Sequence, residues 1–246
     1  MIIAISGKKN SGKDTVAKMI QLIVDEEVGR VSFPKHSTLE NKFAVYEPHA
    51  ITMYQTKRFA DKLKDMVCML LGCTREKLED REFKEKELGE EWWYYYTHTY
   101  GDIPQNLQAY ANFRPSQSGS KYTLKKQTPR LLMQLLGTEC GRQILHPDVW
   151  VNGLLAEYEA SVSNGTYPKW IIPDMRFPNE AEALRYRSIT IRVNRPDVYL
   201  GLVKEHESET ALDNWDNWDY VLENNGTLED LYKKVDSILV ETLIIG

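Results

Sequence analysis

Cysteine is scarce in this chain of 246 residues, which contains only Cys68, Cys73 and Cys140. Their spacing fits neither a disulfide framework nor a zinc site, so we expect free thiols in a reducing, cytoplasmic environment. No apolar run is long enough to span a membrane. Met1 leads into an apolar run without a basic segment, so no secretory signal is predicted.

An excess of positive charge is also missing. The chain has 31 Lys and Arg against 36 Asp and Glu, a formal net charge of −5. This balance argues against a broad surface for nucleic acids or anionic membranes, although a local basic pocket is compatible with it. The aromatic run at residues 92–96 has no interleaved Lys or Arg, which favours packing or an oligomer contact over stacking on single-stranded bases. We therefore expect no nucleic-acid partner and no membrane partner.

What the sequence does contain is an alternation of short apolar segments with segments of helical periodicity. Five segments are predicted as strands: residues 2–6, 51–59, 169–173, 188–194 and 218–223. Strands separated by helices favour an α/β fold, here a parallel β-sheet of about five strands flanked by helices. The length suits a single domain over residues 1–246 that carries an insertion.

The middle of the chain has weaker signals. Residues 59–71 carry apolar side chains at helical spacing and end near Gly72. Residues 74–91 are dense in Lys and Glu, which is typical of a solvated surface helix. Residues 92–127 are predicted to be a long loop or insertion, with a hairpin.

Three further helix starts are indicated by capping residues. Thr128-Pro129 combines a cap residue with proline at the first helical position, and Gly137 is placed as the end of that helix. Asn179 with Glu182 resembles a capping box. Thr227 is predicted to cap a final helix.

The strongest motif follows the first predicted strand. Gly7, Gly12 and Lys13 match the G-x-x-x-x-G-K pattern of a phosphate-binding loop. The glycines let backbone N–H groups curl around phosphate oxygens, the helix N-terminus adds partial positive charge, and Lys13 would reach the β- and γ-phosphates. We predict that the ATP phosphates contact Gly7, Lys9, Asn10, Ser11, Gly12, Lys13, Asp14 and Thr15.

Asp14 departs from the usual pattern, in which Ser or Thr places a hydroxyl on magnesium. A carboxylate is also a hard oxygen ligand, so Asp14 is a candidate ligand for Mg²⁺. Thr15 follows immediately, and the residues leave open which of the two meets the metal.

Residues outside the loop favour a small-molecule kinase. GTPase switches need an N-K-x-D segment that reads the base, but here Asn41-Lys42 is followed by Phe43-Ala44. The D-x-x-G segment of these proteins is absent as well. Motor ATPases usually have an apolar strand that ends in Asp-Glu. Here the apolar segment ends in the single acid Asp174, which is followed by Met175 and Arg176. In a kinase, Asp174 can hold magnesium and Arg176 can contact phosphate.

Phosphoryl transfer between two anionic nucleotides needs more positive charge than Lys13 supplies. The candidates are Lys64, Arg130, Arg142 and Arg176. Each also suits a surface ion pair. Arg130 and Arg176 are favoured because they lie at the ends of predicted elements, where such sites are built.

Several segments of the chain resemble the phage-type deoxynucleoside monophosphate kinases, members of the P-loop NMP kinase superfamily. The combination of Leu-Met-Gln-x-Leu-Gly-Thr with Asp-x-Arg-Phe-x-Asn-Glu is the most specific part, whereas residues 74–127 match nothing. The similar segments are residues 7–15, 59–64, 130–138, Trp150, 174–180, 206–209 and 225–231.

The resemblance implies a P-loop kinase fold with a largely helical acceptor-binding insertion at approximately residues 60–160 and a lid-like segment at approximately 195–209. It implies that the γ-phosphate of ATP moves to a deoxynucleoside 5′-monophosphate, with Mg²⁺, for DNA precursor synthesis. It also suggests a homodimer in the cytoplasm, which is the host cytoplasm if the chain is phage-encoded.

The motif, the charge candidates and the resemblance together give the predicted site residues. The catalytic set would be Lys13, Arg130, Asp174 and Arg176, and the metal ligands would be Asp14 and Asp174. The acceptor nucleotide would lie near Lys64, Arg130, Gly137, Thr138, Trp150, Arg176 and Glu180. Trp150 suits either stacking on a base or packing in the core, and His206 suits either a functional or a capping role.

Two other functions stay open from the residues alone. A P-loop kinase of another small phosphorylated metabolite, such as a coenzyme precursor, would share the loop and the arginines. A non-catalytic nucleotide-binding or DNA-associated protein is disfavoured by the acidic balance.

Overall fold

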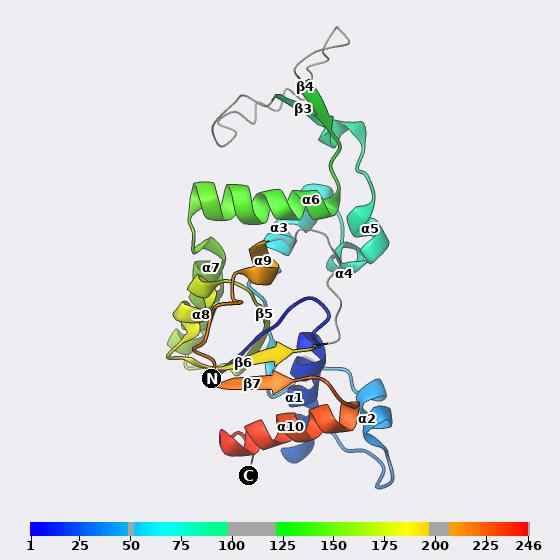
Figure 1. Ribbon diagram of the computed structural model, residues 1–246, viewed down its shortest axis with the longest axis vertical. Helices are drawn as coiled ribbons and strands as arrows, with labels where there is room; N and C mark the ends of the chain where they lie inside the picture. Colours follow the sequence, from blue (N-terminus) through cyan, green and yellow to red (C-terminus); the bar gives the residue numbers. More distant parts are fainter. Residues whose placement is uncertain (49–51, 98–121, 197–206, 246) are drawn as a thin grey trace. The chain divides into compact units, whose positions relative to one another are not determined.

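The computed structural model describes residues 1–48, 52–97, 122–196 and 207–245 (Figure 1). Contacts divide the chain into two compact units. The sheet unit comprises Met1–Asp61 and Trp150–Gly246, and the helical unit comprises Lys62–Val149. None of the described helices is long and apolar enough to cross a membrane.

The sheet unit alternates strands and helices. Its strands form one sheet in the order β2-β5-β1-β6-β7, and every neighbouring pair is parallel. This confirms the predicted α/β fold with a five-stranded parallel sheet. Its elements are β1 (Ile2–Ser6), α1 (Lys13–Glu27), α2 (Leu39–Val45), β2 (Gln55–Thr56), α7 (Val149–Ser163), β5 (Trp170–Met175), α8 (Pro178–Leu184), β6 (Ser188–Asn194), α9 (Glu207–Thr210), β7 (Tyr220–Glu223) and α10 (Leu228–Glu241).

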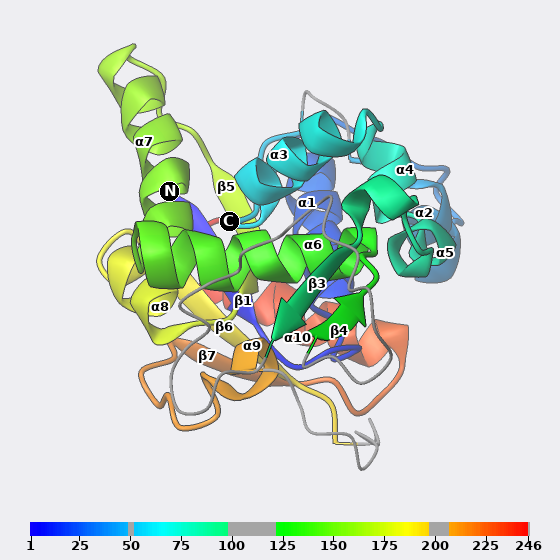
Figure 2. The ribbon, with the colours of Figure 1, turned by 90° about the horizontal axis from the view of Figure 1, so that it is seen from above.

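Apolar residues at alternate strand positions build the core beneath one face of the sheet. Ile3 and Ile5 of β1 belong to one buried cluster with Val16 and Ile20 of α1 and Val235 of α10. Helices α1 and α10 therefore cover this face, and α8, which contacts β1, covers the other (Figures 1 and 2). Since helices cover both faces, the edge at the strand ends is the part of the sheet left to loops.

The position of β1 in the sheet explains where a site forms. The chain reaches β2 and β5 on one side of β1 and β6 and β7 on the other. In open α/β sheets, the crevice for ligands lies outside the carboxyl ends of the strands at such a reversal. Ser6, the last residue of β1, pairs with Met175 of β5 and Arg192 of β6, so the segments after these strands meet.

The helical unit is built around a smaller apolar cluster that includes Val67, Leu78 and Leu132. An antiparallel strand pair, β3 with β4, belongs to it. Its elements are α3 (Asp61–Leu71), which starts in the last residue of the sheet unit's first segment, α4 (Arg75–Glu79), α5 (Arg81–Glu85), η1 (Glu90–Trp92), β3 (Tyr94–Thr97), β4 (Tyr122–Lys125), α6 (Pro129–Gln134) and the π-helical segment η2 (Leu135–Leu145).

Helix ends in the sheet unit agree with the sequence only in part. Thr227 caps α10 as predicted, because its Oγ1 accepts the N–H of Asp230 at 3.2 Å while the Asp230 carboxylate accepts the N–H of Thr227 at 2.9 Å. The cap predicted at Asn179 is wrong, since α8 already begins at Pro178. The second strand is shorter than predicted and spans Gln55–Thr56.

In the helical unit, Thr128 caps α6 as predicted, but Gly137 does not end the helix. The backbone continues in wider π-helical turns to Leu145. A Cβ at Gly137 would lie 2.9 Å from Leu63 Cδ2, so close packing explains this glycine better than helix termination does.

The charged segment 74–91 forms two short helices rather than one solvated helix. Asp80 separates them: it ends α4, and its side chain accepts the N–H of Phe83 at 2.6 Å to cap α5. Leu78 is fully buried, so the segment packs against the apolar cluster. Strands β3 and β4 agree with the predicted hairpin, whose residues 98–121 lie outside the described part of the chain.

Candidate active site

The loop between β1 and α1 has the backbone geometry of a phosphate-binding loop. Gly7 and Gly12 have φ angles of 155° and 99°. A Cβ at Gly7 would lie 2.5 Å from both Ser11 Oγ and the carbonyl oxygen of Val193, and one at Gly12 would lie 2.5 Å from Asn224 Nδ2. Asn224 in turn donates to the carbonyl of Ser11 at 2.9 Å. Both glycines are therefore required by close approach as well as by backbone conformation.

Lys13 is the first residue of α1 and is only 8% exposed. Its Nζ donates to the carbonyl oxygen of Lys8 at 2.7 Å. Burial lowers the pKa of Lys13 to about 8, and the positive charge of Arg176 acts in the same direction, whereas Glu209 and Asp14 oppose the shift. Phosphate oxygens can therefore replace the Lys8 carbonyl as hydrogen-bond acceptors of the Lys13 ammonium.

Arg58 interacts with both candidate metal ligands, Asp14 by an ion pair and Asp174 through its charge. Asp14 is exposed, and its Oδ1 lies 2.7 Å from Arg58 Nη2. Asp174, near the end of β5, accepts the N–H of Phe59 at 3.1 Å and the N–H of Ala60 at 3.2 Å. Burial raises the pKa of the Asp174 carboxyl, although these two N–H groups and the charges of Arg58 and Arg176 act in the opposite direction.

The turn after β5 presents Arg176 toward the loop. Glu180 is 1% exposed, and its Oε2 accepts the N–H groups of Arg176 at 2.7 Å and Phe177 at 3.2 Å. The Arg176 guanidinium pairs with Glu209, and the other Glu209 oxygen accepts the loop N–H of Lys9 at 2.8 Å. Glu180 thus fixes the turn, while Arg176 and Lys9 share one carboxylate.

A further arginine lies next to the loop, on β6. Arg192 donates from Nη1 to Ser6 Oγ at 3.1 Å, and its Nη2 lies 3.2 Å from Asp213 Oδ1. The second oxygen of Asp213 lies 3.1 Å from Lys8 Nζ. Two carboxylates therefore pair with the cations around the loop. Glu209 pairs with Arg176, and Asp213 pairs with Lys8 and Arg192.

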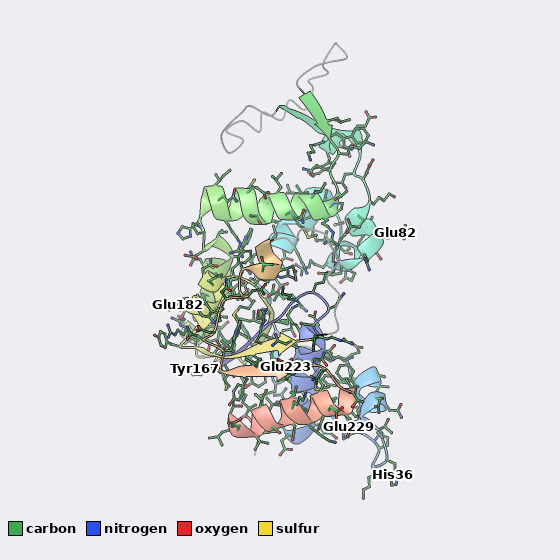
Figure 3. The ribbon with its side chains drawn as sticks, in the orientation of Figure 1. His36, Glu82, Tyr167, Glu182, Glu223 and Glu229 are labelled. Atoms are coloured by element: carbon green, nitrogen blue, oxygen red, sulfur yellow. The ribbon has the colours of Figure 1, made fainter. Side chains whose placement is uncertain are left out.

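A cavity of about 170 Å³ opens beside the loop at the carboxyl ends of β6 and β7. Its lining includes Lys8, Ser11, Arg195 and Glu223, and Glu223 is labelled in Figure 3. Asn194, which also lines the cavity, donates to Glu223 Oε1 at 2.8 Å. This cavity adjoins the phosphate loop, since Lys8, Lys9 and Ser11 belong to its lining.

The remaining predicted acceptor residues belong to the helical unit, apart from Trp150. Lys64 of α3 lies 2.5 Å from Glu79, and Arg130 of α6 pairs with Glu85. Gly137 is buried in η2, followed by the half-buried Thr138. Trp150 is buried in α7, as a packing residue would be. His206 and most of the lid-like segment 195–209 lie outside the described residues.

The sequence reasoning missed four residues that the structure brings to the loop. They are Arg58, Arg192, Asp213 and Asn224, and each contacts the loop or the residues beside it. Arg192 had one local signal, because it is a charged residue within the apolar strand 188–194. Arg58 and Asn224 follow strands, and their role becomes visible only when the strand order is known.

Fold and site together define a P-loop kinase: a glycine loop with a buried lysine at the reversal point of a parallel sheet, with an acid and an arginine at the next strand end.

Among the described residues, no group of three or more His, Cys, Asp or Glu forms a metal site by itself. All three cysteines have free thiols.

Comparison with known proteins makes the class specific. The family described as deoxynucleotide monophosphate kinase matches residues 1–235. The deoxynucleoside-5′-monophosphate kinase of Escherichia phage T5 is 26% identical over 238 residues, which cover 86% of this chain and 85% of that protein. A protein of Acanthamoeba polyphaga mimivirus, provisionally named for the same activity, is 28% identical over 120 residues, or 45% of this chain and 60% of that protein.

The chain belongs to the deoxynucleotide monophosphate kinase family. It is a phosphotransferase that acts on deoxynucleoside monophosphates, and the family's activity implies ATP as a substrate.

Proposed function

We propose that ATP binds the phosphate loop of the sheet unit and that residues of the helical unit hold the deoxynucleoside monophosphate. The observation that carries the donor assignment is the buried Lys13 inside a glycine loop. Family membership supplies the acceptor class. The helical unit, Lys62–Val149, is our candidate for the acceptor-binding insertion that the resemblance implies at approximately residues 60–160.

The chemistry is an in-line displacement. An oxygen of the acceptor phosphate attacks the γ-phosphorus, a P–O bond forms, and the bond to the oxygen bridging the β- and γ-phosphorus breaks to release ADP. The attacking oxygen is already anionic, so no general base is required. Lys13, Arg176 and the loop N–H groups stabilise charge on the transferred group, so catalysis rests on positioning and electrostatics.

Asp14 and Asp174 are the proposed residues for Mg²⁺. Both offer hard carboxylate oxygens near the loop, and Arg58 contacts Asp14 while acting electrostatically on Asp174. Magnesium typically keeps several waters and takes one or two protein carboxylates in addition to phosphate oxygens, a demand that this pair fits. When bound, the ion would offset charge on the β- and γ-phosphates. Replacing Asp174 by Asn should raise the Mg²⁺ concentration for half-maximal turnover, which a magnesium titration at saturating ATP measures.

For the acceptor we propose Lys64 and Arg130 as phosphate-binding cations, with Gly137, Thr138 and Trp150 near the nucleoside. Lys64 lies against Glu79 and Arg130 against Glu85. An incoming phosphate dianion would replace these carboxylates, because it offers more charge to the same donors. Arg176 is proposed to contact the transferred phosphate, with Glu180 as its positioning residue.

We further propose a homodimer and a cytoplasmic location, where ATP and deoxynucleotides meet. Apolar side chains of the helical unit, Met69, Leu70 and Ile144, are 76%, 52% and 78% exposed, which supports a covered surface in solution. Sedimentation velocity across protein concentrations would test the dimer. A monomer at all concentrations would contradict it.

The acceptor assignment is tested by measuring ADP release from Mg-ATP with each of the four deoxynucleoside monophosphates and with AMP, GMP, CMP and UMP in parallel. We expect turnover with deoxy acceptors and much less with ribonucleotides. Measurable ATP binding without turnover on any of the eight would instead point to another small phosphorylated acceptor.

A further inference from the structure

Two carboxylates from one short segment reach the phosphate loop. Glu209 lies in α9, and Asp213 follows in the next turn. Glu209 Oε2 accepts the backbone N–H of Lys9 at 2.8 Å, and Glu209 Oε1 pairs with Arg176. Asp213 pairs with Lys8 and Arg192. About 200 positions of sequence separate Glu209 from Lys9, so only the fold brings them together.

The bond to the Lys9 N–H is the informative contact. The backbone N–H groups of such a loop are the donors that cradle phosphate oxygens. A carboxylate resembles phosphate in offering anionic oxygens to the same donors. An ordinary structural ion pair would need only the Arg176 side chain, whereas Glu209 takes a side-chain cation and a loop amide together, the pair of donors that a phosphate group would use.

We infer that Glu209 is an internal competitor for the phosphate site, so that it sets the apparent affinity for ATP. In the nucleotide-free enzyme its carboxylate holds the Lys9 N–H and Arg176. When ATP binds, phosphate oxygens take both donors and Glu209 leaves. This inference rests on the proposed binding of ATP to the loop. Because the free enzyme must first release Glu209, the measured affinity equals the intrinsic affinity reduced by the fraction of open loop.

The surrounding charges support competition rather than permanent attachment. Glu209 raises the pKa of Lys13 whereas Arg176 lowers it, so both act electrostatically on the loop lysine. An anionic side chain that stayed beside the loop would repel the phosphates of ATP, which carry like charge. The Glu209 carboxylate therefore stabilises the nucleotide-free loop, and its negative charge destabilises the loop with ATP bound.

A different role for Glu209 makes the opposite prediction. If it instead positioned Arg176 for phosphoryl transfer, removing its charge would lower kcat and leave ATP binding unchanged or weaker. Under competition, removing the charge tightens binding of the phosphate chain.

The test is equilibrium binding of ATP and of inorganic tripolyphosphate, without acceptor, to the full chain and to Glu209→Gln and Glu209→Ala. Titration calorimetry gives both affinities. We expect roughly threefold to tenfold tighter binding for Glu209→Gln and at least as much for Glu209→Ala, which also removes the remaining acceptor oxygen. The matched control is Glu182→Gln on α8, labelled in Figure 3, which removes a carboxylate that pairs with Arg185 instead of the loop. Its affinities should equal those of the unchanged chain.

Unchanged or weaker tripolyphosphate binding in both Glu209 variants, with their thermal unfolding intact, would overturn the inference. A large loss of kcat with unchanged ATP affinity would assign Glu209 to positioning Arg176 and would also overturn it. Failure of the acceptor assignment is separate: an enzyme that binds tripolyphosphate more tightly after the substitution yet phosphorylates no deoxynucleotide would sustain the competition and refute the acceptor.

Discussion

The sheet unit and the helical unit hold their cations in different ways. In the sheet unit, Lys13 is buried in a loop whose backbone fixes its surroundings, and Arg192 is tied to Ser6. In the helical unit, Lys64 and Arg130 reach toward the carboxylates of Glu79 and Glu85 on neighbouring helices. The backbone of the loop therefore fixes the position of Lys13 before a ligand arrives, although Glu209 must still leave Arg176 and the Lys9 N–H. In the helical unit, both cations depend on the displacement of their carboxylate partners.

Glu79 illustrates the second situation. Partial burial raises the pKa of its carboxyl, but hydrogen bonds from Lys64 and Lys84 outweigh that effect and hold the pKa at about 2. Glu79 is thus anionic at any neutral pH and keeps Lys64 engaged. In the sheet unit, Glu209 pairs with Arg176, so in both units a carboxylate lies against a cation proposed to bind phosphate.

The largest expected effect is on kcat, and it distinguishes the loop lysine of the sheet unit from the lysine of the helical unit. Lys13→Ala should lower kcat by about 10³, because the loop loses the ammonium that stabilises charge on the transferred phosphoryl group. Lys64→Ala should instead act mainly on the KM for the acceptor. Steady-state kinetics with both substrates varied checks this, with circular dichroism confirming the fold. Near-normal kcat in folded Lys13→Ala would refute its assignment.

The next prediction concerns the core of the helical unit. Leu78→Ala should destabilise the protein by about 2–5 kcal/mol, because a fully buried side chain leaves a cavity. The matched control is Leu131→Ala, whose side chain is 43% exposed. Urea denaturation of both variants measures the difference. Equal midpoints would show that residues 74–91 form a solvated surface after all.

The proposed contact of Arg130 with the acceptor phosphate is tested by Arg130→Ala. We expect the KM for the deoxynucleotide to rise roughly tenfold to a hundredfold with the KM for ATP unchanged, because a charge-assisted bond to the acceptor phosphate is lost. Arg187→Ala removes an arginine that pairs with Glu159 on the sheet unit and serves as the control. A rise in the KM for ATP instead would place Arg130 on the donor side.

The smallest effect is a pH dependence. The pKa of Lys13 is lowered to about 8, so the free enzyme loses this charge as the pH rises through 8 rather than near the usual value of 10.5. The kcat/KM for ATP should therefore fall about tenfold per pH unit above that point and stay level just below it. In Lys13→Arg, whose side chain keeps its charge, the fall should vanish. A flat profile in the unchanged enzyme would contradict the shift.

Local sequence signals were reliable where one short segment decides the structure. The spacing of Gly7, Gly12 and Lys13, the strand 188–194 and the Thr227 cap each depend on residues within a few positions, and all three agree with the structure. The helix end predicted at Gly137 was wrong, because this glycine is needed for close packing against Leu63. The cap predicted at Asn179 was wrong, because Glu180 accepts the backbone N–H of Phe177 at the start of that helix.

The sequence by itself determined the alternation of strands and helices, the phosphate loop and, through its motifs, the kinase family. Only the tertiary structure decided which charges meet at the loop. Arg58, Arg192, Glu209 and Asp213 carry no shared local pattern, and they converge because five parallel strands end at one edge. The physical reason is that hydrophobic periodicity acts over a few residues, whereas electrostatic partners are chosen by strand order across the whole chain.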